Sequence, residues 1–330
     1  MCPATYLPIP PRGHVAWILL PLVAAACTSN PVSSSGPPAA TSLLYVANTP
    51  QFSITAYPAD ARGNATPAVT MAGLNTSLDA PLGIARDAAG RLYVANHGTG
   101  SILVFAAGAT GNVAPVDTIM GGNTGLLYVV GIAVDGAGRL YVVNDQPYTR
   151  VFSITAYAAG ATGNAAPVAT ITGSSTGLNS PWAIVLDAAG RNLYVANFAD
   201  SITVYPVNAT GNVAPTKTIA GGNTALSGPD AIALDAADRI YVANFNNSSI
   251  TVYASGATGN AFPIDSIGGS NTGLNLPSGV AVDPAGRLIY VTNGNNTVTV
   301  YPTGATGNVA PIDTIVGSNT GLNGPTFVTF

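Results

Sequence analysis

Residues 83–125 read GIARDAAGRLYVANHGTGSILVFAAGATGNVAPVDTIMGGNTG, and the chain contains close variants of this stretch six times. The most constant part is a core of the form Leu/Ile-Tyr-Val-x-Asn. Its tyrosine recurs in steps of 48, 48, 53, 47 and 49 residues, at Tyr45, Tyr93, Tyr141, Tyr194, Tyr241 and Tyr290. A long period repeated this often predicts an array of supersecondary units rather than a conventional globular domain.

Each unit carries the signals of four strands, which we call a, b, c and d in chain order. In the second unit they are expected at 83–87, 92–96, 101–105 and 114–119. Asp-Ala-Ala-Gly between a and b predicts a tight turn. Gly-Ala-Thr-Gly-Asn between c and d predicts a second hairpin turn whose glycine takes a positive φ. Strand d of each unit contains a proline, which removes a hydrogen-bond donor, so we expect d to be the outer edge strand.

Four antiparallel strands repeated radially predict an all-β fold, a six-bladed β-propeller that spans 42–330. The first unit begins at its strand b, with Leu44, and has no strand a. The last unit ends with Phe-Val-Thr-Phe at 327–330, where a strand a belongs. We therefore expect the C-terminal strand to complete the first blade and close the ring, which removes the open edges of the array.

The repeat resembles two known families of propeller repeats. Tyr-Val-Thr-Asn at 290–293 matches the name-giving tetrapeptide of YVTN β-propeller repeats, and the general pattern GIAVDAAGRLYVAN followed by SITVY resembles the NHL repeat. The resemblance covers 42–330 and implies the β-propeller fold. It implies no single function, because such propellers include adhesive or surface-layer proteins, scaffolds, and a minority of lactonases and lyases.

The first 26 residues have the pattern of a secretory signal peptide. Arg12 and His14 precede an apolar run at 15–26, which is too short to span a bilayer comfortably. The residues LVAAAC at 22–27 resemble the lipobox of bacterial lipoproteins, a resemblance that implies acylation of Cys27. The alternative is ordinary secretory cleavage, since three consecutive alanines before Cys27 also satisfy that pattern.

A Ser/Pro-rich tether is expected at 27–41, because this stretch has little to bury. The protein is therefore expected to be exported and lipid-anchored at the bacterial cell envelope, at the outer membrane or the cell surface, or otherwise secreted. The lipid anchor is the only membrane contact expected, and the propeller is expected to be a monomer.

Composition excludes several functions. Charged residues are 7% of the chain, the net charge is -4, and there is no glutamate and a single lysine, Lys217. We expect no nucleic-acid binding, because no basic patch can form. Both cysteines precede residue 28, so the repeats contain no disulfide and no cysteine nucleophile. A general base near neutral pH would have to be His97 or a perturbed aspartate.

These observations favour a surface-tethered, non-catalytic propeller that binds a protein or a glycan, or that acts as a structural scaffold of the envelope. The alternative is a metal-dependent hydrolase or lyase of the six-bladed lactonase type. Gluconolactonase-like propellers, which the architecture resembles, bind a divalent metal partly through a glutamate, and this chain has none. No cofactor is expected, and Ca²⁺ held by Asp and Asn oxygens at the channel mouth is the natural candidate for a bound metal.

Differences between units concentrate in the loop after strand b and in the residue before the conserved part of strand a. Both positions are expected on one face of the ring, around the channel mouth, where loops on a rigid scaffold commonly bind ligands. The hypothesis is a shallow site at that mouth; the alternative is drift of unconstrained loops. The site comprises Trp182, Tyr148, His97, Phe198, Phe245, Asp145, Asp200 and Asp230.

Polar residues that recur in every unit are interpreted as structural. The strand-b asparagine is expected to bond backbone in the loop that follows it, and the Asp/Arg pair around the a–b turn to stabilise that turn. Arg86 is an exception, since it replaces an aliphatic residue of the other units. Its expected partner is Asp79 or an ion in the channel, because an unpaired buried charge is costly.

Overall fold

The computed structural model describes residues 42–146 and 148–330. The predicted signal peptide, the tether and Cys27 lie outside the described residues. Within them the chain forms 24 strands and two short 3-10 helices, arranged in six four-stranded antiparallel sheets. The predicted all-β, six-bladed propeller is confirmed. No helix in this part of the chain is long and apolar enough to cross a membrane.

The first three blades follow the order a, b, c, d. Blade 1 consists of β24 (Pro325–Thr329), β1 (Leu43–Asn48), β2 (Ser53–Pro58) and β3 (Val69–Met71). Blade 2 consists of β4 (Pro81–Arg86), β5 (Leu92–Asn96), β6 (Ser101–Phe105) and β7 (Asp117–Ile119). Blade 3 consists of β8 (Val129–Val134), β9 (Leu140–Gln146), β10 (Val151–Tyr157) and β11 (Ala169–Thr172). The two 3-10 helices are η1 (Leu74–Thr76) and η2 (His97–Thr99).

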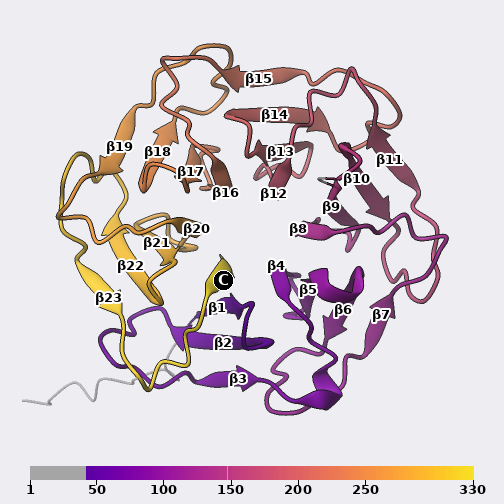
Figure 1. Cartoon of the computed structure of the whole chain (residues 1–330), viewed down its shortest axis with the longest axis horizontal. Coiled ribbons are helices and arrows are strands. Elements are labelled where there is room, and N and C mark those ends of the chain that lie inside the picture. The colour runs from indigo at the N-terminus through magenta and orange to yellow at the C-terminus, as the bar shows by residue number, and fades with distance from the viewer. Residues whose placement is uncertain (1–41, 147) are drawn as a thin grey trace, which may run out of the picture. The chain divides into compact units, whose positions relative to one another are not determined.

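The remaining blades repeat this order. Blade 4 consists of β12 (Pro181–Leu186), β13 (Asn192–Asn197), β14 (Ser201–Pro206) and β15 (Lys217–Ala220). Blade 5 consists of β16 (Pro229–Leu234), β17 (Ile240–Asn244), β18 (Ser249–Tyr253) and β19 (Asp265–Gly268). Blade 6 consists of β20 (Pro277–Val282), β21 (Leu288–Asn293), β22 (Thr297–Pro302) and β23 (Asp313–Ile315). Strand a of every blade lies nearest the centre of the ring and strand d on the circumference (Figure 1).

The ring closes as the sequence predicts. The C-terminal strand β24 pairs antiparallel with β1, with Val328 opposite Val46. It supplies the fourth strand of a blade whose other three strands come from the start of the propeller. The chain end therefore lies at the centre of the ring, in yellow beside the indigo β1 (Figure 1).

The core lies between the blades. Six clusters of buried apolar side chains each join two neighbouring sheets, because strand residues alternate between the two faces of their sheet. In the cluster between blades 5 and 6, Tyr241 and Ile250 of blade 5 pack with Ile289 and Tyr301 of blade 6. The repeated tyrosines are therefore packing elements between the blades.

The connection between strands c and d differs from the predicted tight hairpin. In blade 2 it extends over 106–116, and Gly111, at φ 76°, forms a parallel bridge with Met71 of the preceding blade. The Gly111 N–H donates to the Thr70 carbonyl at 2.7 Å. The same bridge recurs at all six seams. Strand d is therefore covered by the next blade and is no free edge, and the prolines lie two residues before it.

The strand-b asparagine joins the connection that precedes strand a to strand c. Asn244 is fully buried, and its side-chain oxygen accepts the Ser227 N–H at 3.0 Å, in the connection that enters strand a. Its amide nitrogen donates to the Thr251 hydroxyl of strand c at 3.0 Å. The backbone bond thus goes to the loop before strand a, and not to the loop after strand b as expected. The a–b turn pair behaves as predicted, with Arg91 Nε 2.7 Å from Asp87 Oδ2.

Candidate ligand-binding face

The loops that differ from blade to blade open on one face of the ring, which we call the loop face. It consists of the loops between strands b and c and the loops between strand d and the next strand a. Backbone bonds tie the two sets together: the N–H groups of His97, Asp145 and Phe198 donate to the carbonyls of Ala80, Tyr128 and Ser180 at 3.2, 3.2 and 2.8 Å. The predicted positions after strand b and before strand a are therefore neighbours in space.

A bulge at the start of strand a explains the second variable position. In every blade the pairing of strands a and b shifts register after the first residue of strand a. A bulge of this kind redirects a side chain out of the regular pleat. The second residues of the six strands are Leu82, Val130, Trp182, Asp230, Ser278 and Thr326.

One aromatic group on the loop face spans blades 2 and 3. The ring centroids of His97 and Tyr128 are 5.9 Å apart, and those of Tyr128 and Tyr148 are 6.1 Å apart. Tyr148 is 86% exposed, so its ring is open to a ligand. Tyr128 was not predicted as a site residue. Its signal in the sequence is that the repeat places its tyrosines in strand b, in LYVAN, and at the end of strand c, in SITVY, and Tyr128 lies at neither position.

A second aromatic group spans blades 4 and 5. Phe198 lies between Trp182 and Phe245, with a centroid separation of 6.2 Å to each. All three side chains are partly exposed. The structure therefore brings together three of the predicted residues here and two, His97 and Tyr148, in the first group. The two groups occupy four consecutive blades.

Asp145, whose backbone N–H donates to the Tyr128 carbonyl, is 7% exposed. Its Oδ1 has no hydrogen-bond partner among the residues that the structure describes. Burial raises the pKa of Asp145 to about 6, and the nearby His97 opposes that rise. At the same place in blades 1 and 2, Thr49 Oγ1 and His97 Nδ1 lie 2.8 and 3.0 Å from the carbonyl that begins the next strand a. Because a carbonyl only accepts, His97 carries its proton on Nδ1, which leaves Nε2 as an acceptor in the neutral ring.

Asp230 is the second buried carboxyl of the predicted site. It is 6% exposed, and desolvation raises its pKa to about 7. The equivalent residue of blade 6, Ser278, donates its hydroxyl to the Pro325 carbonyl at 2.8 Å. A carboxylate cannot make that bond, whereas a protonated carboxyl can. Asp230 is therefore a buried group in strand a of blade 5, and it is not an exposed contact for a ligand.

Asp200 has a role in shaping the loops. Its Oδ1 accepts the Gly228 N–H at 2.7 Å, which links blade 4 to the loop that enters blade 5. Asn296 and Ser248 make the equivalent bonds to Gly324 and Leu276 in other blades. Of the eight predicted site residues, the five aromatic side chains belong to the two groups, the carboxyls of Asp145 and Asp230 are buried, and Asp200 braces a loop.

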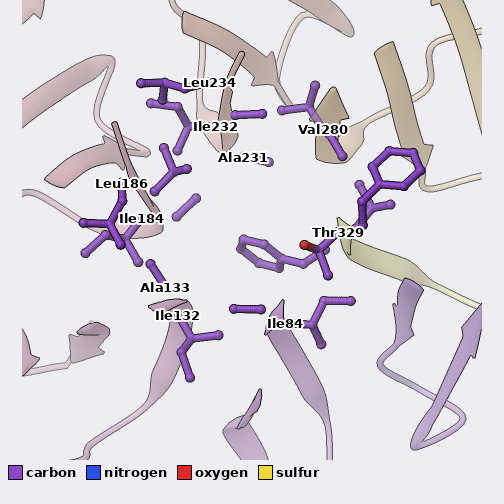
Figure 2. Close-up of a pocket in the computed structure, with 18 of the residues that line it drawn as sticks. Ile84, Ile132, Ala133, Ile184, Leu186, Ala231, Ile232, Leu234, Val280 and Thr329 are labelled. Carbon is purple, nitrogen blue, oxygen red and sulfur yellow. The ribbon is translucent and has the colours of Figure 1, made fainter. Parts of the chain in front are cut away.

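The centre of the ring contains a cavity of about 330 Å³ that is open to solvent. Side chains of strand a from all six blades line it, including Ile84, Ile132, Ile184 and Val280 (Figure 2). Phe327 of β24 packs against the clusters between blades 1 and 2 and between blades 4 and 5, so it lies across the channel. The side chains that line the channel are therefore largely apolar, and Phe327 partly fills the space between them.

Arg86 lies in this cavity and is not paired with Asp79. Its guanidinium carbon is 4.7 Å from the centre of the Tyr45 ring, and its Nε is buried without a hydrogen-bond partner. The backbone of Asp79 instead bonds to Asn96 and Gly98 on the loop face. The expected Arg86–Asp79 pair is therefore wrong. Arg86 immediately precedes the a–b turn, which places it at the other end of strand a from the loop face.

Within residues 42–146 and 148–330 no group of three or more His, Cys, Asp or Glu side chains is arranged to hold a metal ion. The aspartates of the predicted site illustrate why. Asp145 and Asp230 lie in different blades, 3 and 5. The Asp200 carboxylate already accepts a hydrogen bond from a backbone N–H.

Comparisons with known proteins support the fold. The model of a family described as "Lactonase, 7-bladed beta-propeller" matches residues 132–232, less than half of the chain. These residues include Asp145, Tyr148, Trp182, Phe198 and Asp230. No curated protein matches the sequence.

Among solved structures, the chain is similar to one from a crystal structure of a nidogen/laminin complex, with a TM-score of 0.62 and 18% identity over 87% of this chain and 97% of that chain. Matches to solved structures number 1253 chains. At such low identity, and with a fold this widespread, the likeness shows the propeller architecture alone.

Proposed function

We propose that the protein is a non-catalytic binding propeller whose loop face binds a glycan. The observation that supports this is the confinement of two aromatic groups to the variable loops of four consecutive blades. Aromatic residues that belong to the repeat are buried between blades, whereas these lie outside the repeat and are partly or largely exposed. The blade does not need them for its packing.

A glycan fits this surface because its rings present apolar C–H faces and polar edges. The tilted rings of Tyr128, Tyr148 and Trp182 offer apolar faces at centroid separations near 6 Å from their aromatic neighbours. His97 Nε2 and the amide groups of the loops offer hydrogen bonds to hydroxyls. The surface has few charges, which suits a neutral sugar better than a nucleic acid.

The double variant Tyr148→Ala/Trp182→Ala is expected to lose at least about tenfold in affinity for the glycan that wild type selects from an array, since each buried aromatic contact contributes on the order of 1 kcal/mol or more. Titration calorimetry measures the loss. Phe262→Ala is the matched control, because Phe262 is 72% exposed but lies in a c–d connection away from the loop face. Unchanged affinity in the double variant would contradict the proposed site.

A lactonase-like activity is the second candidate, and the family match to residues 132–232 favours it. The chemistry available is a carboxyl with a pKa of about 6, Asp145, close to His97. A panel of lactones, assayed with and without Ca²⁺, tests whether the protein hydrolyses such a substrate. Turnover that Asp145→Asn abolishes would replace the glycan proposal with an enzymatic one.

We further propose that the propeller is exported and tethered to the envelope through acylated Cys27. The support is the sequence pattern of residues 1–41. Metabolic labelling with palmitate is expected to mark wild type and to leave Cys27→Ser unlabelled. An unlabelled wild type would favour ordinary secretion instead.

A further inference from the structure

We propose that the central cavity binds a small organic monocarboxylate, with its carboxylate on Arg86 and its apolar tail along the channel. This site is independent of the loop face, because Arg86 lies at the opposite end of strand a. The ligand class follows from three features: the lining of the cavity, the state of Arg86 and the size of the space.

The side chains that line the cavity are apolar except at one end. Of the side chains around the cavity only Arg86 is charged, and only Thr329 is polar and uncharged. The others are aliphatic or aromatic and come from all six strands a. An apolar cavity with one or two polar groups at a defined place is the usual form of a small-molecule site.

Arg86 is available to an anion. Among residues 42–146 and 148–330 no ion pair joins it to a carboxylate, the chain end included. The guanidinium lies over the Tyr45 ring in a cation–π contact, and its buried Nε has no hydrogen-bond partner. Arg91 and Arg239 differ, because their Nε atoms bond to Asp87 and Asp235 at 2.7 and 2.6 Å.

The blade itself does not require a cation here. The residues at the place of Arg86 in blades 3 to 6 are Val134, Leu186, Leu234 and Val282. A buried donor without a partner costs about 1–3 kcal/mol, and a carboxylate would supply the missing acceptor through paired N–H bonds. An arginine at this position is therefore explained by a ligand better than by the packing of the blade.

The size of the cavity limits the ligand. About 330 Å³ is at the lower end of the range for small-molecule sites, roughly 300–1,000 Å³. Phe327 crosses the channel and restricts the depth that a tail can reach. One guanidinium balances one negative charge, so a monocarboxylate with a short aliphatic tail fits better than a phosphate or a dicarboxylate.

The test is titration calorimetry of the protein with a series from acetate to octanoate, with hexanol as the uncharged analogue of hexanoate. We expect saturable binding that strengthens with tail length up to the limit of the cavity and that hexanol does not reproduce. Arg86→Leu is expected to weaken hexanoate binding at least tenfold. This variant reproduces the leucine of blades 4 and 5, and its melting temperature checks that it folds.

Arg287→Leu is the matched control, since Arg287 is an exposed arginine of another a–b turn. It is expected to bind hexanoate as wild type does. The proposal is overturned if no carboxylate binds saturably to wild type, if Arg86→Leu binds hexanoate as tightly as wild type, or if Arg287→Leu loses binding equally. None of these outcomes depends on glycan binding at the loop face.

Discussion

A chain that ends at Gly324, without residues 325–330, is expected to be largely unfolded or aggregated at room temperature. The deletion removes β24, the sole partner of β1 on its inner edge, and exposes that edge to other chains. It also removes Phe327 and Val328 from the apolar clusters. Losses of up to about 3 kcal/mol for each such side chain, added to the lost strand pairing, are a large part of the stability of a typical domain, about 5–15 kcal/mol.

Size-exclusion chromatography and a thermal melt followed by circular dichroism measure this outcome. Removal of Phe330 alone is the control, because its ring contacts Tyr290 at a 5.1 Å centroid separation but lies beyond the end of β24. This variant is expected to remain a folded monomer with a modestly lower melting temperature. A cooperative, wild-type-like melt of the longer deletion would show that the ring does not depend on its last strand.

The second large effect is expected at Asp230. Asp230→Asn should raise the free energy of unfolding at pH 8 by up to about 4 kcal/mol and should change it little at pH 4. The buried carboxyl has a pKa of about 7, above its ordinary value of 3.8, so the folded state holds a proton that the unfolded state releases. The asparagine amide donates a hydrogen bond without that titration.

The sign of the pH dependence follows from this raised pKa. The contribution of Asp230 is fully present below about pH 4, where both states are protonated. It falls by about 1.4 kcal/mol per pH unit up to about pH 7 and is lost above it. Denaturant unfolding of wild type and Asp230→Asn between pH 4 and pH 8 measures the difference. It should grow with pH and then level off.

Two further variants make this result specific. Asp230→Ser introduces the residue found at the same place in blade 6, whose hydroxyl donates to Pro325, and should remove the same pH dependence. Asp60→Asn changes the net charge equally at an exposed turn and should leave it in place. A difference between wild type and Asp230→Asn that does not vary with pH would contradict a protonated Asp230 in the fold.

The propeller could be predicted closely because its information is local and repeated. The alternation of LYVAN and SITVY specifies strands, the turn residues specify antiparallel neighbours, and the missing strand a at one end and the extra strand at the other specify closure. The c–d connection was predicted less well. This connection contacts the preceding blade through Gly111 and Met71. These residues are far apart in the sequence, and no sequence pattern indicates that they pair.

The candidate site could be predicted in location but only partly in composition. Divergence between units located the loop face, and it named Trp182, Tyr148 and His97. It omitted Tyr128, which lies between His97 and Tyr148 because a left-handed backbone at φ 51° turns the chain before strand a. The divergence between units also predicted Asp230 and Tyr148 alike as site residues, although Asp230 is 6% exposed and Tyr148 is 86% exposed.

The sequence by itself therefore determined the repeat, the number of blades, the closing strand and the face on which the blades differ, because each follows from periodicity and local turn chemistry. Only the tertiary structure decided which side chains meet there, which carboxyls are buried, and that Arg86 stacks on Tyr45 without a carboxylate partner. Those properties depend on neighbouring blades and on distances across the channel. They arise when the ring closes, and no single unit of the repeat contains them.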